Sequence, residues 1–239
     1  MTNSEFSNEF DILFNNIMSN QAPGLDEYEK SVFLTKAQED IVLAYYTGRN
    51  ESGDYLEGSE EVRQYLYTLI KDVKGSLLTM YKEEDEMPFI GISSNSKFYF
   101  IDEHYLAILS EHVITTDSRV VKVVPVTTDE FLKIKNNPFR GLSKNRVLRL
   151  DIHCIAQDKN DKDYFARTQE LVTDINIKEY IARVLMKPQP IILKNLDDDL
   201  EINGISIETP CMLDSSLHRK ILDRAVLLAK ASFTSNPGQ

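Results

Sequence analysis

The chain has 239 residues, of which 42% are hydrophobic and 27% are charged. This composition is typical of a folded protein with a substantial core and excludes an intrinsically disordered chain. No apolar run approaches the roughly 18–20 residues of a membrane helix, and the N-terminus lacks the basic flank and apolar stretch of a secretory signal. Two cysteines, Cys154 and Cys211, are too few for a disulfide framework and predict free thiols in a reducing compartment.

The net charge of −11 argues against a protein that binds nucleic acid over its whole surface. The charge is unevenly distributed. Residues 1–60 carry three basic against twelve acidic residues, a balance of −9, and residues 118–150 carry eight basic against two acidic residues, a balance of +6. Such asymmetry suits a protein that docks or stacks in one orientation, although two solvated faces of opposite sign give the same pattern.

Helical spacing of apolar residues predicts a helix over residues 6–17 and, after Pro23-Gly24, a second one over about 25–46. Ser59 is a suitable N-cap for a third helix. The buried face expected for that helix consists of Val62, Leu66, Leu69, Ile70 and Val73.

From about residue 76 to 207 the chain changes to short, β-branched apolar runs with frequent breakers, which is typical of strands. The strands expected here are 76–81, 97–101, 120–126, 147–156, 175–184 and 191–193. Residues 102–112 fit either a helix or a strand, and 128–135 fit a short helix capped by Thr127 or Thr128. Asn203-Gly204 predicts a two-residue hairpin.

A last helix is expected over about 215–233, capped by Asp214 or Ser215. The expected fold is therefore α+β, in which the N-terminal helices and the C-terminal helix form a bundle and carry a β-rich central domain. The expected domains are an N-terminal helical region at 1–75, the β-rich domain at 76–210, and a C-terminal segment at 211–239 that returns to the bundle.

The sequence contains no phosphate-binding glycine loop, nucleophile elbow or zinc-binding helix, so we expect no catalytic, cofactor or metal site. His153 and Cys154 are adjacent in an expected strand and would point to opposite faces, which prevents joint nucleophilic action. The acidic runs at 83–86 and 197–199 lack the spacing of a calcium loop, and we interpret them as solvated loops.

The most distinctive loop is residues 136–146, which combines clustered bases with one aromatic residue. Loops of this kind often bind phosphate or an acidic protein surface, so we predict partner contacts there. The alternative is a β-connection whose aromatic residue packs inward. His218, near the start of the last helix, is a further candidate for a partner contact, with a solvated histidine as its alternative. The predicted partner-contact residues are Phe139, Arg140, Lys144, Arg146 and His218.

Four segments resemble a family of structural virion proteins from crAss-like and other tailed phages of Bacteroidales. The first is SNQAPGLDEYEKSVFLTKAQE at 19–39, and the second is VPVTTDEF at 124–131 with NPFRG at 137–141. The third is KPQPIIL at 187–193, and the fourth is TPCML at 209–213 with LHRKILDRAV at 217–226. Met212 departs from the pattern, because the family is expected to have an acidic residue at this position.

The resemblance implies a non-enzymatic virion protein of the neck or tail, similar to podoviral head–tail adaptors and tail ring proteins. It implies assembly in the host cytoplasm into a closed, twelve-fold ring of identical subunits, next to the portal and neighbouring tail ring proteins. Genomic DNA would pass through the channel without specific binding, and no membrane is involved. We further hypothesise that part of the acidic N-terminal region faces this channel, where repulsion would keep DNA from adhering.

Two other functions remain open from the residues alone. A DNA-binding accessory protein would use the basic segment 119–149 and would bind DNA in a salt-sensitive way. A small hydrolase would need a pocket with two convergent ionisable groups, and the sequence suggests no such pair.

Overall fold

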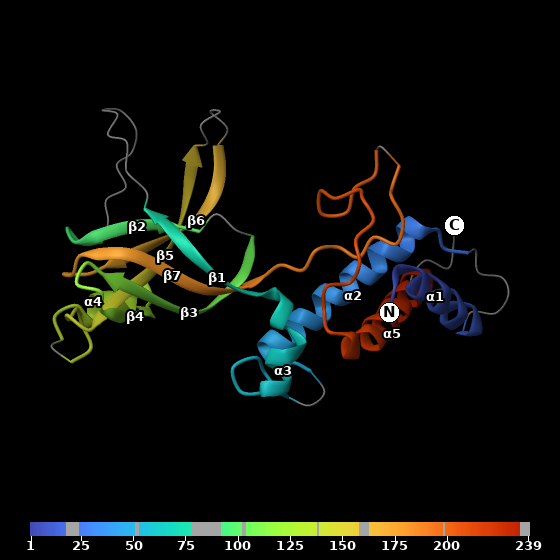
Figure 1. The fold of residues 1–239 in the computed structure, drawn as a ribbon, viewed down its shortest axis with the longest axis horizontal. Helices are drawn as coiled ribbons and strands as arrows, with labels where there is room; N and C mark the ends of the chain where they lie inside the picture. Colours follow the sequence, from blue (N-terminus) through green and yellow to red (C-terminus); the bar gives the residue numbers. More distant parts are fainter. Residues whose placement is uncertain are drawn as a thin grey trace. The chain divides into compact units, whose positions relative to one another are not determined.

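The computed structural model describes residues 1–17, 24–50, 53–77, 92–101, 104–137, 139–157, 163–197 and 199–234, without the side chains of 16–17, 152–157, 163–167 and 233–234. The chain forms two compact units (Figure 1). A helical unit contains Met1–Ile70 and Lys187–Gln239, and a barrel unit contains Lys71–Met186. The last expected strand, 191–193, and the hairpin at 203–204 therefore belong to the helical unit.

Seven strands close into a barrel in the order β1-β2-β6-β5-β4-β3-β7 (Figure 1). The strands are β1 (Ile70–Leu77), β2 (Ser96–Phe100), β3 (Tyr105–Thr115), β4 (Val120–Pro125), β5 (Arg146–Gln157), β6 (Asp163–Val172) and β7 (Ile177–Met186). Ion pairs between β1 and β7 lie where the barrel closes, with Asp72 to Arg183 at 2.7 Å and Lys74 to Glu179 at 3.0 Å. Closure satisfies the backbone groups that an open sheet would leave unpaired at its edges.

The ladder between β4 and β5 is parallel, whereas the other recorded ladders of the barrel are antiparallel. A parallel pair needs a crossover connection, and here that connection contains the helix α4 (Thr128–Ile134). The side chain of Thr127 caps α4 by accepting a hydrogen bond from the backbone N–H of Glu130. The crossover therefore places α4 and the loop after it outside the strand ladder.

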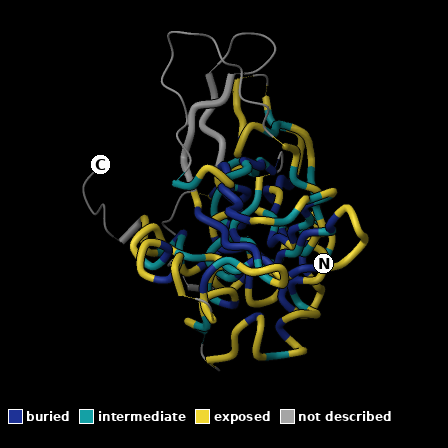
Figure 2. Tube along the Cα trace, turned by 90° about the vertical axis from the view of Figure 1, so that its left-hand side faces the viewer, coloured by how far each residue is buried: buried dark blue, intermediate teal, exposed yellow. Residues whose placement is uncertain are grey.

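The barrel core is mainly apolar but contains buried polar side chains, including Gln169 and a network centred on Glu111. The apolar core includes Val113, Val147, Leu171 and Val184, and buried residues lie mainly toward the inside of the trace while exposed ones lie mainly on its outer turns (Figure 2). The network joins Glu111 to Arg149 at 2.7 Å and to the hydroxyl of Tyr180 at 2.8 Å. Burial raises the pKa of Glu111, and the guanidinium of Arg149 and the hydroxyl of Tyr180 oppose that rise. A charged pair inside a barrel must satisfy its own hydrogen bonds, and this pair does so.

The expected fold class is wrong in its central feature. The fold is dominated by a closed seven-stranded barrel rather than by a helical bundle that carries a β-domain. The chain nevertheless mixes helices and strands. Besides α4, its helices are α1 (Asn3–Ile17), α2 (Glu27–Thr47), α3 (Glu60–Tyr65), the 3-10 turn η1 (Tyr67–Leu69) and α5 (Ser215–Thr234).

The helical unit differs from a bundle because an extended segment packs along α2. The side chains of Ser31 and Thr35 bond the backbone of Leu193 and Ile191, and Gln38 donates to the carbonyl of Gln189 at 2.7 Å. These three α2 residues are buried although they are polar. A helix-periodic pattern of apolar residues detects helix–helix contacts, but it does not detect a polar face that binds extended backbone.

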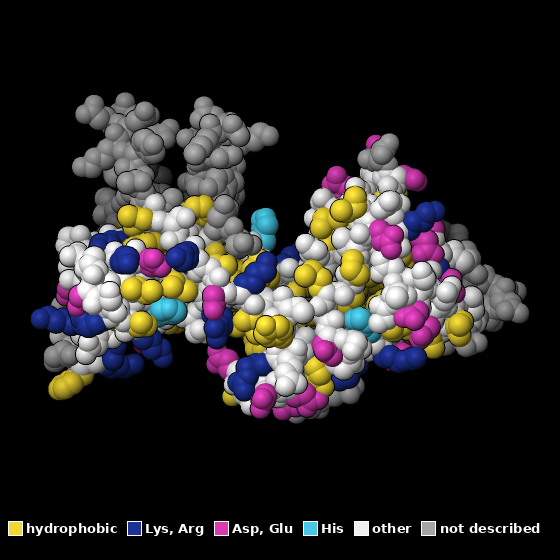
Figure 3. Space-filling model, in the orientation of Figure 1, with side chains coloured by type: hydrophobic (Ala, Val, Ile, Leu, Met, Phe, Trp, Pro, Cys, Tyr) yellow, Lys and Arg dark blue, Asp and Glu magenta, His cyan; other side chains and the backbone are white. Residues whose placement is uncertain are grey.

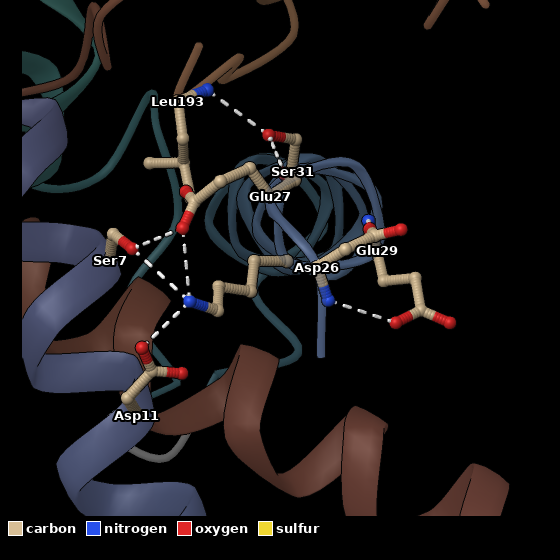
Figure 4. A network of polar contacts seen from close by, with 8 residues as sticks. Ser7, Asp11, Asp26, Glu27, Glu29, Ser31 and Leu193 are labelled. Atoms are coloured by element: carbon tan, nitrogen blue, oxygen red, sulfur yellow. Dashed lines mark hydrogen bonds and ion pairs between the residues drawn. The ribbon is translucent and has the colours of Figure 1, made fainter. Parts of the chain in front are cut away.

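A buried lysine of α2 joins α1 to α2, and its partners Ser7, Asp11 and Glu27 are labelled in Figure 4. Lys30 is only 3% exposed, and its ammonium group contacts Asp11 at 2.7 Å, Glu27 at 3.1 Å and the hydroxyl of Ser7 at 3.2 Å. Burial by itself lowers the pKa of Lys30, but the hydrogen bonds and charges of Asp11 and Glu27 outweigh burial and raise the pKa overall. Asp26 and Glu29 form a capping box at the start of α2.

Several predicted elements are confirmed and others are corrected. The helix expected at 128–135, the last helix and the hairpin are confirmed, and the hairpin has Asn203 and Gly204 at positive φ of 53° and 79°. The third helix ends at Tyr65, so the residues expected on its buried face beyond that point lie outside it: Leu66 follows the helix, Leu69 belongs to η1, and Ile70 and Val73 belong to β1. The ambiguous segment at 102–112 is mostly strand, because β3 begins at Tyr105. The sequence did not predict β6. The strand expected at 191–193 is instead an isolated bridge from Ile192 to Thr209.

Candidate assembly surface

The loop that follows α4 is held in shape by one asparagine. The side-chain oxygen of Asn137 accepts hydrogen bonds from the backbone N–H groups of Phe139 at 2.9 Å and Arg140 at 3.2 Å, and its carbonyl accepts from Gly141 at 2.8 Å. A Cβ atom at Gly141 would lie 2.7–2.8 Å from three backbone carbonyl oxygens of 134–137. This turn therefore requires glycine, because any side chain would displace backbone.

Two arginines fix the second half of the loop from the barrel side. The guanidinium of Arg146 donates to the carbonyl of Phe139 at 3.1 Å, and that of Arg119 donates to the carbonyl of Lys144 at 3.5 Å. Of the predicted contact residues, Arg146 therefore also has a structural role. Sequence reasoning missed the roles of Asn137 and Arg119, although an asparagine followed by Pro and Gly is a recognisable turn signal.

Phe139 lies at the tip of this ordered loop and is 86% exposed. The alternative interpretation, in which the aromatic ring packs inward, is therefore wrong. Leu132, on the neighbouring α4, is also exposed. An exposed aromatic residue on a loop held by its own hydrogen bonds loses little conformational entropy on binding, which is the property of an interface anchor.

The bases around this tip mostly lack acidic partners. Arg140 reaches Glu130 at 3.5 Å, but Lys133, Lys135, Lys144 and Arg146 form no ion pair within the described part of the chain. Figure 3 shows Lys and Arg side chains over α4 and the loop beyond it. We name residues 131–146 the basic loop; this stretch holds five basic and no acidic residues. Arg149, the last of the basic segment, instead lies inside the barrel.

The structure does not bring His218 to this surface. His218 belongs to the helical unit, is 6% exposed and lies between the N-terminal amine, 2.6 Å from Nδ1, and the carbonyl of Leu213, 3.0 Å from Nε2. Burial lowers its pKa, and the positive N-terminal amine lowers it further. The neutral imidazole therefore acts as an internal connector between the chain start, α5 and the segment before it.

The helical unit has an acidic surface that sequence reasoning did not single out. Residues 53–67, here named the α3 lobe, contain four acidic residues and one basic residue, and Figure 3 shows acidic side chains gathered over α3. Asp54, Glu57 and Glu60 form no ion pair within the described residues. Tyr55 and Tyr67 are 52% and 75% exposed.

Other chemistry is sparse among the described side chains. No group of three or more His, Cys, Asp and Glu residues is placed there to hold a metal ion. Burial raises the pKa of Cys211 to about 11, so its thiol stays protonated at neutral pH and is unsuited to nucleophilic attack. The side chains of His153 and Cys154, the run at 83–86 and Asp198 lie outside the described residues. None of the helices in the described ranges is long and apolar enough to cross a bilayer.

Comparison with known proteins defines the class of this chain. The family model described as "Phage tail ring protein 3/4" matches residues 1–239. The chain therefore belongs to the phage tail ring protein 3/4 family, and its class is a structural protein of the phage virion. The predicted resemblance to virion proteins of crAss-like phages is confirmed.

Two relatives come from one phage, Bacteroides phage crAss001. The chain is 40% identical over 246 residues to a protein named "Ring protein 3", which covers all of this chain and 99% of the relative. It is 35% identical over 237 residues to a protein named "Ring protein 4/5", which covers 98% of this chain and 94% of that relative. A single phage thus carries two relatives of this chain under the names of different rings.

Proposed function

We propose that this chain is a non-enzymatic, ring-forming component of the phage neck or tail, a head–tail adaptor or tail ring whose copies surround the DNA channel. The observation that carries the proposal is the family match over residues 1–239. A ring needs a heterologous interface, in which one surface of a subunit meets a different surface of the next. The basic loop and the α3 lobe are two unlike surfaces of this kind, because most of the charge on each forms no ion pair with the described residues.

The proposal extends to the partners and to the channel. The ring is twelve-fold, assembles in the host cytoplasm and contacts the portal and other tail rings. Two relatives named as separate rings of one phage support stacking of related rings along one axis. Part of the acidic N-terminal region faces the channel, where its negative charge lets DNA pass without the counterion release that drives adhesion.

Electron cryomicroscopy of the phage particle that carries this chain tests the proposal. We expect the chain as a closed ring in the neck or tail, with an axial channel wide enough for duplex DNA. Subunit counting in the same map gives the symmetry directly. Location in the capsid shell, or absence from the particle, would overturn the proposal.

A further inference from the structure

We infer that the basic loop of one subunit binds the α3 lobe of a second copy of this chain, and that this contact joins neighbours within the ring. The inference rests on the proposed function and names the partner of the basic loop. It concerns contacts between copies only. Three features of the two surfaces support it.

The first feature is complementary charge that is largely unpaired among the described residues, where one base of the loop, Arg140, contacts an acid at 3.5 Å. The basic loop carries five bases and no acid, and the α3 lobe has a balance of −3. Opposite potentials across an interface speed encounter, fix register and disfavour wrong partners. A contact between these surfaces would offset the charge of the lobe and part of the charge of the loop.

The second feature distinguishes the α3 lobe from the acidic surfaces of α1 and α2. Most acids on α1 and α2 already pair internally: Asp11 and Glu27 with Lys30, Glu9 with Arg219, Glu39 with Lys187, and Asp40 with Arg224. A base from another subunit would have to compete with these pairs. At Asp54, Glu57 and Glu60 no such competition exists within the described residues.

The third feature is that both surfaces combine their charge with exposed aromatic rings. Phe139 projects from the basic loop, and Tyr55 and Tyr67 are exposed on the α3 lobe. Gly58 permits the position of the Tyr55 ring, since a Cβ there would lie 2.8 Å from two ring carbons. Met212, whose carbonyl accepts from the hydroxyl of Thr68 beside Tyr67, adds apolar surface. Aromatic anchors with a charged rim are the usual composition of a specific interface.

Site-specific photo-crosslinking tests the contact directly. The full chain, assembled into its ring or into phage particles, carries benzoylphenylalanine in place of Phe139. Mass spectrometry should identify the crosslink in the peptide that contains residues 53–67 of another copy. A crosslink to any other segment, to another ring protein or to DNA, or no crosslink in assembled material, would overturn the inference.

Charge exchange supplies an independent readout. The loop variant Lys133→Glu/Lys144→Glu and the lobe variant Asp54→Lys/Glu57→Lys each place like charges opposite one another. Each should weaken incorporation into rings by roughly tenfold or more, because facing like charges cost several kcal/mol. The chain with all four changes restores opposite charges and should assemble again, as should an equal mixture of the two variants in alternating rings.

Matched controls separate this contact from a general effect of charge. Lys36→Glu/Lys178→Glu and Asp199→Lys/Glu201→Lys change the same number of charges at exposed positions elsewhere and should leave assembly unchanged. If the fourfold variant fails while wild type forms rings in the particle, the inference is wrong and the proposed function stands. If wild type never enters a ring, the proposed function itself fails.

Discussion

In the barrel unit, Glu111 and Arg149 are both buried and lie 2.7 Å apart, whereas in the helical unit Lys30 is buried but its partners Asp11 and Glu27 remain partly exposed. The difference decides what happens when one partner is removed. The charged residue that remains inside the barrel stays in a region of low dielectric constant. In the helical unit, the remaining carboxylates are instead hydrated. Two buried charges in one chain should therefore respond very differently to mutation.

The largest effect is expected from Glu111→Gln. The substitution keeps the shape of the side chain but leaves Arg149 with the exposed Asp151 as its one acidic partner among the described residues. Loss of one member of a buried pair typically costs about 3–5 kcal/mol, and we expect about 3 because Asp151 remains. Urea unfolding followed by hydrogen exchange in barrel peptides measures the loss.

The control for this prediction removes the charge pair as a whole. Glu111→Met combined with Arg149→Met should recover most of the stability, since apolar residues of similar size replace a buried pair at little cost. A double variant no more stable than Glu111→Gln would show that the hydrogen-bond geometry of the network, rather than charge compensation, determines its contribution.

A second, intermediate effect tests how tightly the barrel interior is packed. At Gly75 on β1, a Cβ atom would lie 2.3 Å from Cδ1 of Tyr180. Gly75→Ala must therefore shift the Tyr180 ring and strain its bond to Glu111, at a cost of about 1–3 kcal/mol. Thermal unfolding monitored by tyrosine circular dichroism measures it. Gly24→Ala is the matched control, because no atom of the described residues, chain neighbours aside, lies within 4 Å of its added Cβ.

In the helical unit, we expect a smaller loss of stability when the buried charge of Lys30 is removed. Lys30→Met keeps the buried stem and removes the ammonium group, and the carboxylates of Asp11 and Glu27 can then be hydrated. We expect at most about 1 kcal/mol of destabilisation. A loss as large as that of Glu111→Gln, measured by the same urea series, would contradict the distinction between the two units.

The parts that the sequence predicted well are those specified by local chemistry. The capping of α4 by Thr127, the turn at Asn203-Gly204 and the last helix depend on residues a few positions apart. The prediction failed where distant segments decide the structure. Closure of the barrel requires β7 to return to β1, and no local pattern encodes that pairing.

The candidate surface shows the same limit. The basic loop stood out because its bases and Phe139 are close in sequence. The α3 lobe stands out only when Asp54, Glu57 and Glu60 are seen to form no ion pair with the described residues. His218 lies on α5 in the helical unit, where Leu213 and the N-terminal amine determine its environment. Whether a polar residue is buried depends on tertiary contacts that a single sequence does not display.

A further prediction for the helical unit concerns pH. Burial and the N-terminal amine lower the pKa of His218 from 6.5, and the carbonyl of Leu213 and the charge of Asp214 oppose that shift without cancelling it. The unfolded state therefore takes up a proton first as pH falls. Stability from this group is fully present above about 6.5, decreases as pH drops below that value, and levels off once the lowered folded-state pKa has been passed.

Hydrogen exchange of peptides from α1 and α5 between pH 5 and 7.5 tests this prediction, with rates corrected for the intrinsic effect of pH. His218→Gln should remove most of the pH dependence while its amide can still bond the carbonyl of Leu213. An unchanged pH profile in this variant would assign the dependence to another group. Barrel peptides in the same spectra serve as the internal control.

The smallest effect on stability is expected at Phe139, which we expect to act in assembly. Phe139 is 86% exposed, and only its backbone takes part in the hydrogen bonds of the loop. Phe139→Ser should therefore change the free energy of unfolding by no more than about 0.5 kcal/mol, as exposed substitutions generally do. Ring incorporation by the same variant should nevertheless fall, because an interface anchor is lost. Leu132→Ser, an equally small change on the exposed side of α4, shows whether the loss is specific to the loop tip. If Phe139→Ser were as destabilising as Gly75→Ala, the ring of Phe139 would be part of the fold. The distinction between residues that stabilise the barrel and residues that are available to a partner would then be wrong.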